Sequence, residues 1–168
     1  MPVAEHKAKG KESIRCYVIT VSDTRDETTD TSGQTIKSAL SAHGHETSAY
    51  RIVKDEPVQI EALLKEALAS PDIDAVIVNG GTGIAPRDGT FEVVSRLLEK
   101  KLDGFGEIFR YLSYLDIGSA AIMSRAAAGT ARGKVLISLP GSKGAVSLAM
   151  EKLIVPELGH MVSQLQGK

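Results

Sequence analysis

Apolar runs alternate with amphipathic stretches along the chain, and glycine-rich or acidic turns separate them. Short apolar runs rich in β-branched residues predict strands, and apolar positions spaced three and four residues apart predict helices. The predicted strands cover residues 14–21, 47–53, 75–78 and 134–139. Predicted helices follow them and contain Ile36, Ile60, Val93 and Val146. This alternation predicts an α/β fold, a three-layer sandwich with a mostly parallel sheet.

One connection is too short for a parallel sheet. The stretch from Ser124 to Leu139 leaves little room for a crossover helix, which normally needs about a dozen residues or more. We therefore expect a local antiparallel excursion there.

Local signals predict several helix ends. Ser32 or Thr31 can cap the first helix, and Thr90 can cap the helix that follows the 75–78 strand. Lys100 and Lys101 suit the C-terminal end of that helix, where cations interact favourably with the helix dipole. A short helix is expected after Phe105.

Length and composition restrict the class of protein. The 168 residues suit one domain, predicted over 13–168, behind a polar tail at 1–12. A formal net charge of −1 gives no support for binding nucleic acid. No apolar run is long enough for a membrane span, and no secretion signal is visible, so we expect a cytoplasmic protein. Cys16 lies in an apolar strand and is expected to be a buried, inert thiol.

The stretch from Ala75 to Thr90 is the strongest functional signal. A buried strand breaks into Asn79-Gly80-Gly81-Thr82-Gly83 and then into a charged turn containing Asp88. Glycines at the carboxyl end of a strand can turn several N–H groups toward one phosphate, and a carboxylate there suits Mg²⁺. The alternative is a tight strand-to-helix turn without a ligand.

Other strand ends carry polar residues. Pro140-Gly141-Ser142 forms a second glycine loop before a helix and is a second candidate anion site. Ser22 and Asp23 end the first strand. Asp55 ends the second, where it is either functional or an acid that stabilises the next helix through its dipole.

The motifs, in order along the chain, resemble the molybdopterin-binding family of molybdenum cofactor biosynthesis. They are Thr20-Val21-Ser22-Asp23, Asp30-x-Ser32-Gly33, Asn79-Gly80-Gly81-Thr82-Gly83, Arg87-Asp88-x-Thr90, Gly104-Phe105-Gly106-Glu107, Ser124-Arg125 and Pro140-Gly141-Ser142. The resemblance spans nearly everything after the tail.

The resemblance implies a reaction in which Mg-ATP adenylylates molybdopterin and pyrophosphate is released. Asp55 and Asp88 match the acids to which the family assigns catalytic and metal-binding roles. Mg²⁺ would be the cofactor, and ATP and molybdopterin the substrates. The implied substrate-binding residues are Ser22, Asp23, Gly80, Gly81, Thr82, Gly83, Thr90, Ser124, Arg125, Pro140, Gly141 and Ser142.

Two other functions are compatible with the same residues. One is a molybdopterin-binding protein of the same fold without catalysis, because one branch of the family is not uniformly active. A nicotinamide-dependent oxidoreductase is disfavoured, because the glycine loop follows the third strand and lacks the G-x-G-x-x-G spacing. The resemblance, together with the aromatic-rich segment 105–114, also predicts a homo-oligomer, either a trimer or a hexamer.

Overall fold

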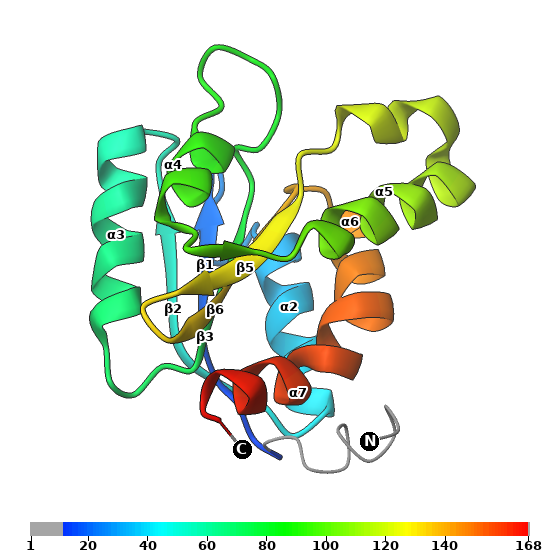
Figure 1. The fold of residues 1–168 in the computed structure, drawn as a ribbon. Helices are drawn as coiled ribbons and strands as arrows, with labels where there is room; N and C mark the ends of the chain where they lie inside the picture. Colours follow the sequence, from blue (N-terminus) through cyan, green and yellow to red (C-terminus); the bar gives the residue numbers. More distant parts are fainter. Residues whose placement is uncertain (1–11, 168) are drawn as a thin grey trace.

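The computed structural model describes residues 12–167, and a six-stranded mixed sheet forms its centre (Figure 1). The strands lie in the order β2-β1-β3-β6-β5-β4. Their bounds are β1 Arg15–Val21, β2 Glu46–Val53, β3 Ala75–Asn79, β4 Lys100–Lys101, β5 Ala127–Ala131 and β6 Lys134–Leu139. β2, β1, β3 and β6 pair in parallel, whereas β5 pairs antiparallel with β6 and β4. The predicted antiparallel excursion is confirmed.

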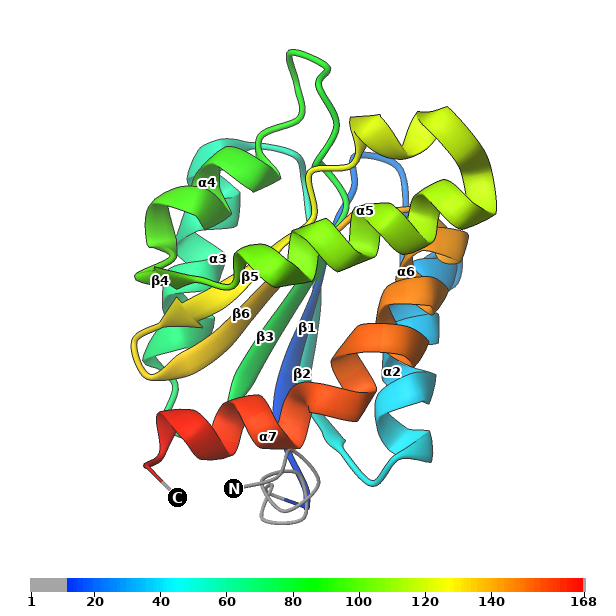
Figure 2. The same ribbon diagram turned by 45° about the vertical axis from the view of Figure 1, so that its right-hand side comes forward.

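Helices cover both faces of the sheet (Figure 2). One face carries α2 (Thr31–Ala42), α5 (Asp103–Ile117), α6 (Lys143–Ala149) and α7 (Val155–Leu165), and the other carries α3 (Pro57–Ala69) and α4 (Thr90–Leu97). A 3₁₀ segment, η1 (Gly118–Met123), extends α5, and a π-helical turn, η2 (Met150–Ile154), joins α6 to α7. The predicted three-layer α/β architecture is therefore confirmed.

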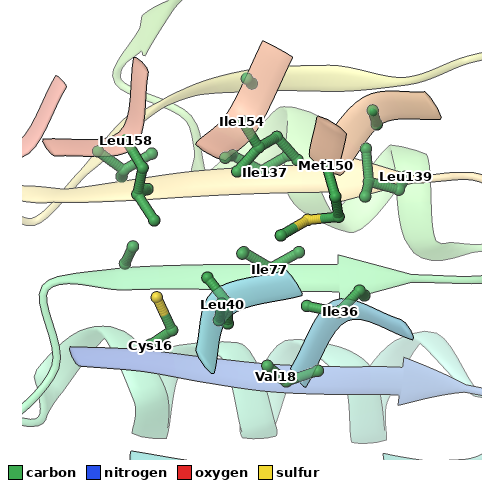
Figure 3. Close-up of a cluster of buried hydrophobic side chains, with 14 of the residues drawn as sticks. Cys16, Val18, Ile36, Leu40, Ile77, Ile137, Leu139, Met150, Ile154 and Leu158 are labelled. Atoms are coloured by element: carbon green, nitrogen blue, oxygen red, sulfur yellow. The ribbon is translucent and has the colours of Figure 1, made fainter. Parts of the chain in front are cut away.

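Side chains of β1 alternate between two apolar clusters. Cys16 and Val18 pack with α2, while Tyr17 and Ile19 pack with α3. Both faces of this strand are covered, which explains its unbroken apolar sequence. Figure 3 shows the first cluster, in which Cys16 lies among aliphatic side chains. Burial raises the pKa of its thiol to about 12, so the prediction of an inert Cys16 is consistent with its surroundings.

Four local predictions were wrong. Asp30, rather than Ser32 or Thr31, caps α2, because its carboxylate accepts a hydrogen bond from the Gly33 amide at 2.9 Å. Thr90 begins α4 but makes no capping bond, and Gly89 occupies the cap position. Lys100 and Lys101 form β4, since they pair with β5.

The fourth error concerns α5, which is not a short helix that follows Phe105. It runs for 15 residues and already includes Gly104, because the apolar stripe through Phe109 packs on the sheet and outweighs the glycine's low helix propensity. Within residues 12–167, no helix combines the length and apolar character that a membrane span requires.

The predicted tail, residues 1–12, lies outside the described residues except for its last position.

Candidate functional site

The first glycine loop begins where β3 ends, and its backbone is of a kind that favours glycine. Gly80 and Gly81 have φ angles of 93° and 67°. A Cβ on Gly80 would lie 2.2 Å from the Val21 carbonyl oxygen, and one on Gly81 would lie 2.3 Å from the Thr90 hydroxyl. The loop is therefore folded closely against β1 and α4, and a side chain at either position would displace it.

The second glycine loop meets the first. A Cβ on Gly141 would lie 3.1 Å from the Cα of Gly80, and the Gly80 amide donates to the Leu139 carbonyl at 3.0 Å. After this contact, the Ser142 hydroxyl caps α6 by accepting from the Ala145 amide at 3.2 Å. Parallel pairing of β3 with β6 places both loops at one edge of the sheet.

The two loops line a first cleft of about 590 Å³. The end of β1 and the helical segments α5 and η1 complete its wall. Of the residues expected to bind substrate, those lining this cleft are Ser22, Gly80, Gly81, Thr82, Gly83, Ser124, Pro140, Gly141 and Ser142. From the sequence we expect both glycine loops to face one crevice, with Asp55 and Asp88 pointing into it. Both loops and Asp88 line this cleft, but Asp55 does not, so the prediction was wrong for Asp55.

A second cleft of about 500 Å³ lies on the other side of the charged turn. Asp55, Arg87 and Arg96 line it, together with the start of α3. Asp88 lines both clefts. The two acids that the sequence singled out are therefore in the second cleft together, and only Asp88 of the two also reaches the first.

Asp88 is half-buried and held by its own turn. Its Oδ2 accepts a hydrogen bond from the Ala85 amide at 3.0 Å, and the same oxygen would lie 2.5 Å from a Cβ on Gly83. The absence of a side chain at Gly83 thus lets the Asp88 carboxylate approach the first glycine loop. A carboxylate beside backbone amides at a loop junction can help to hold a phosphate-bound cation.

Asp55 is 7% exposed, and its carboxylate does not stabilise α3 as a cap. It instead accepts a hydrogen bond from the Gly89 amide at 3.2 Å, at the start of α4. Burial raises the pKa of Asp55, and repulsion from Asp88 and Asp23 adds to this effect, while the Gly89 bond opposes it. A buried carboxylate beside two other acids is in an environment that would favour a nearby cation.

Asp23 lines neither cleft. It accepts two hydrogen bonds from Arg87 and one, at 3.1 Å, from the Asp55 amide. These bonds, led by those from Arg87, lower the pKa of Asp23. Arg87 also donates to Glu56 at 2.9 Å. The predicted substrate-binding residue Asp23 thus ties the turn before Asp88 to the ends of β1 and β2.

Arg125 also holds a loop rather than lining a cleft. Its Nε donates to the Thr82 carbonyl at 2.9 Å, and its Nη2 donates to the carbonyl of Gly83. Glu92 accepts from the same guanidinium, which lies 4.7 Å from the ring centroid of Phe91. The hydrogen bond from Arg125 lowers the pKa of Glu92. These contacts fix the carbonyls of Thr82 and Gly83 in the first glycine loop.

Thr90 is the third predicted binding residue that lines neither cleft. Its amide donates to the Gly81 carbonyl at 3.0 Å, and its buried hydroxyl has no hydrogen-bond partner among residues 12–167. It therefore contacts the loop from behind.

Four polar residues at the first cleft were missed from the sequence. Thr24, Arg25 and Ser113 line it, and Ser32 donates to the Gly141 carbonyl at 2.6 Å. Ser22 was the one sequence signal for Thr24 and Arg25. A serine hydroxyl can hold a turn by accepting hydrogen bonds from the amides two and three residues on, as Ser22 does here.

The acids could hold a metal only with help from a ligand. Within residues 12–167, no three His, Cys, Asp or Glu side chains cluster to make a metal site of protein groups alone. Mg²⁺ commonly uses one or two carboxylates together with substrate phosphates and water. Asp88 and Asp55 fit that limited role, because both carboxylate residues line the second cleft.

The family model described as "Probable molybdopterin binding domain" matches residues 17–160. The chain belongs to this family. The resemblance noted from the sequence motifs is therefore confirmed.

Relatives within the molybdopterin-binding family match nearly the whole chain. The molybdenum cofactor biosynthesis protein B of Halalkalibacterium halodurans is 52% identical over 166 residues, which cover 98% of each chain. A crystal structure of a molybdenum cofactor biosynthesis protein B has a TM-score of 0.90 and 51% identity, covering 93% of this chain and 98% of that one. A structure of MogA has a TM-score of 0.78 and 28% identity, covering 91% and 99%.

Proposed function

We propose that the protein adenylylates molybdopterin with Mg-ATP, giving adenylyl-molybdopterin and pyrophosphate. Membership of the molybdopterin-binding family supports the choice of acceptor. The observation that carries the proposal is that Asp88 lines both clefts. A two-substrate reaction needs such a point, where a group from each substrate can meet beside the same carboxylate.

The first cleft is the proposed molybdopterin site. Both glycine loops line it, and the absence of side chains at Gly80, Gly81 and Gly141 leaves the loop backbone open to close contact with a phosphate. At about 590 Å³, its volume falls in the usual range for small-molecule sites. The terminal phosphate of molybdopterin would lie at the glycine loops, within reach of Asp88 at the Gly83 end.

The second cleft is the proposed ATP site. Arg87 and Arg96 line it and can donate hydrogen bonds to phosphate oxygens. Four carboxylates line it as well, so a triphosphate would enter together with its Mg²⁺. Asp55 and Asp88 line it too and would hold the Mg²⁺ that accompanies ATP. When bound, the metal would neutralise negative charge on the phosphates.

The chemistry needs no protein nucleophile. An oxygen of the molybdopterin phosphate attacks the α-phosphorus of ATP, a new P–O bond forms, and the bond from the α-phosphorus to the bridging oxygen breaks. Pyrophosphate leaves with that oxygen and its electron pair. The residues of this chain position the two phosphates in line and stabilise their charge, which accounts for most catalysis in phosphoryl transfer.

The test is molybdopterin-dependent release of pyrophosphate by purified protein with Mg-ATP. We expect one pyrophosphate for each adenylyl-molybdopterin formed, and no release without molybdopterin. Pyrophosphate release that does not depend on molybdopterin, or the absence of adenylylated product at saturating substrates, would overturn the proposal.

A second function, binding of molybdopterin without turnover, needs only the first cleft. Both glycine loops line that cleft, and Asp55 does not. If ATP does not enter the second cleft, the first can still bind molybdopterin alone. Tight molybdopterin binding with no detectable ATP binding would support this function over the enzymatic one.

We further propose that the protein forms a homo-oligomer about a threefold axis, as a trimer or hexamer. An apolar surface on α5 and η1 supports this: its members are 49 to 80% exposed. They are Ile108, Tyr111, Tyr114, Leu115, Ile117, Ile122 and Met123. A large exposed apolar patch is typical of an interaction surface. The segment adjoins the first cleft, since Ile117 and Met123 also line it.

A further inference from the structure

We propose that Arg25 binds the terminal phosphate of the pterin substrate and makes the first cleft selective for the phosphorylated form. This inference rests on the proposed binding of molybdopterin in that cleft. Arg25 belongs to the loop after β1 and was not among the residues expected from the sequence to bind substrate.

The charge of the first cleft points to Arg25. Among the described residues that line this cleft, it is the only Lys or Arg, and Asp88 is the only acid. An anionic ligand therefore has one cationic side chain to approach. A guanidinium can donate two parallel hydrogen bonds to a phosphate, which backbone amides at a glycine loop cannot do with a full positive charge.

The Arg25 guanidinium is held in place through one of its three nitrogen atoms. Its Nη1 donates to the Gly141 carbonyl at 3.1 Å and lies 3.7 Å from Oδ1 of Asp30, which is fully buried. Asp30 is itself fixed by hydrogen bonds from the Gly33 amide and the Tyr50 hydroxyl. Nε and Nη2 of Arg25 have no hydrogen-bond partner among residues 12–167, and the side chain is 32% exposed. Two donors thus remain for a ligand.

The position of Arg25 is at the meeting point of the two glycine loops. It donates to Gly141, and Gly141 contacts Gly80 so closely that a Cβ would lie 3.1 Å from the Gly80 Cα. The Arg25 amide is held by the Ser22 hydroxyl at 3.0 Å. A phosphate at the loops would therefore receive backbone amides and an oriented guanidinium in one place.

Ser32 provides a matched control, because it holds the same carbonyl without carrying charge. Its hydroxyl donates to Gly141 at 2.6 Å. Ser32→Ala removes one bond that positions the second loop and leaves Arg25 intact. Arg25→Gln removes both the charge and the two-donor geometry of the guanidinium, whereas Arg25→Lys keeps the charge and loses only that geometry.

The experiment compares molybdopterin with the same molybdopterin after phosphatase treatment. Affinity of the full-length protein for each form is measured by pterin fluorescence, and their ratio is the phosphate preference. Hydrogen bonds to charged groups predict that Arg25→Gln lowers this preference roughly tenfold or more. Arg25→Lys should lower it less. Ser32→Ala should weaken the binding of both forms by the same factor and so keep the wild-type phosphate preference.

Each result decides the inference. A wild-type preference that persists in Arg25→Gln would overturn it, as would an equal loss of preference in Ser32→Ala, which would make Arg25 only a support for the loop. If wild-type protein binds both forms equally, the role of Arg25 fails while molybdopterin binding stands. If wild-type protein binds neither form, the proposed function fails as well.

Discussion

Arg87 and Asp23 lie 64 residues apart in the chain and join two loops through paired hydrogen bonds. The Nε–Oδ2 distance is 2.6 Å and the Nη2–Oδ1 distance is 3.1 Å. Because Asp88 follows Arg87 directly, this pair holds the turn that carries the acid shared by both clefts. An exposed ion pair contributes little stability on its own. Its importance is therefore expected in the position of Asp88 rather than in the stability of the fold.

The first prediction tests whether the Arg87–Asp23 pair affects turnover without affecting the stability of the fold. Arg87→Gln should lower turnover about tenfold, as expected when a positioning contact is lost, and should change the melting temperature by roughly 3 °C at most. Lys152→Gln is the control: Lys152 pairs with Glu151 on η2 at 2.9 Å, and neither residue lines a cleft. The control should lose no activity. An Arg87→Gln variant with wild-type turnover would show that Asp88 does not depend on this pair.

The second prediction concerns the glycine loop and compares two glycines with positive φ. Gly81 (φ 67°) has the Thr90 hydroxyl and the Asp55 carboxylate within 3 Å of a Cβ, whereas Gly44 (φ 77°) has open space there. Gly44→Ala should cost about 1–2 kcal/mol in unfolding free energy, from backbone strain alone. Gly81→Ala should cost about 1–3 kcal/mol more, from overpacking, and should abolish molybdopterin binding.

Urea unfolding and pterin fluorescence measure the two effects. Equal destabilisation of the two variants would mean that the first glycine loop relaxes freely, and the close packing against α4 would then have no energetic consequence.

The third prediction is a pH dependence of stability from Asp55. Burial raises the pKa of this carboxyl above its ordinary value of 3.8, so the folded protein binds the proton more tightly than the unfolded chain. The unfolding free energy therefore falls as the pH rises from about 3.8 through the folded pKa, and the loss persists at neutral pH. Asp55→Asn keeps an acceptor for the Gly89 amide and removes this pH-dependent loss of unfolding free energy.

We expect Asp55→Asn to melt at the same temperature as wild type or higher at pH 7, with the difference shrinking as the pH approaches 4. If Asp55 helps to hold Mg-ATP, turnover should nevertheless fall tenfold or more. Lower stability of the variant at every pH would contradict the burial argument, and full activity would leave Asp55 as a support for α4.

Much of the fold followed from the sequence, because covered strands leave unmistakable apolar runs. Strand β6 was predicted with its observed bounds, and the short connection after Ser124 correctly indicated antiparallel pairing. The errors lay where pairing across the chain decides structure: Lys100 and Lys101 are polar and exposed, and their strand exists because of hydrogen bonds to β5. No local sequence pattern indicates such a pairing partner.

The site was only partly predictable for the same reason. Glycine loops are visible because their composition is constrained locally, and both line the first cleft. The roles of Arg125 and Asp23 depend on partners more than 30 residues away, Thr82 and Arg87. A charged residue in a motif therefore looked like a substrate ligand although its observed contacts are with the loops that shape the site. Arg25 was missed because the residues next to it in the sequence do not indicate that its side chain contacts Gly141.

The fourth prediction tests assembly through the apolar surface on α5 and η1. Ile122 is 80% exposed on that surface, and Val58 is 81% exposed on α3. Ile122→Glu should shift the protein to smaller species in light scattering at micromolar concentration, because a charge is costly in an apolar interface. Val58→Glu is the matched control and should keep the wild-type mass. A monomeric wild-type protein would contradict the proposed oligomer.

The most direct test of the central claim follows the α-phosphorus of ATP in a single turnover. Protein in excess over molybdopterin is mixed with Mg-ATP labelled at the α-phosphate, and the pterin product is separated. We expect the label to move to molybdopterin, and Asp88→Asn to slow this transfer roughly 10²-fold or more while its melting temperature stays near that of wild type. Molybdopterin that binds fully while the label stays in ATP would contradict the enzymatic account.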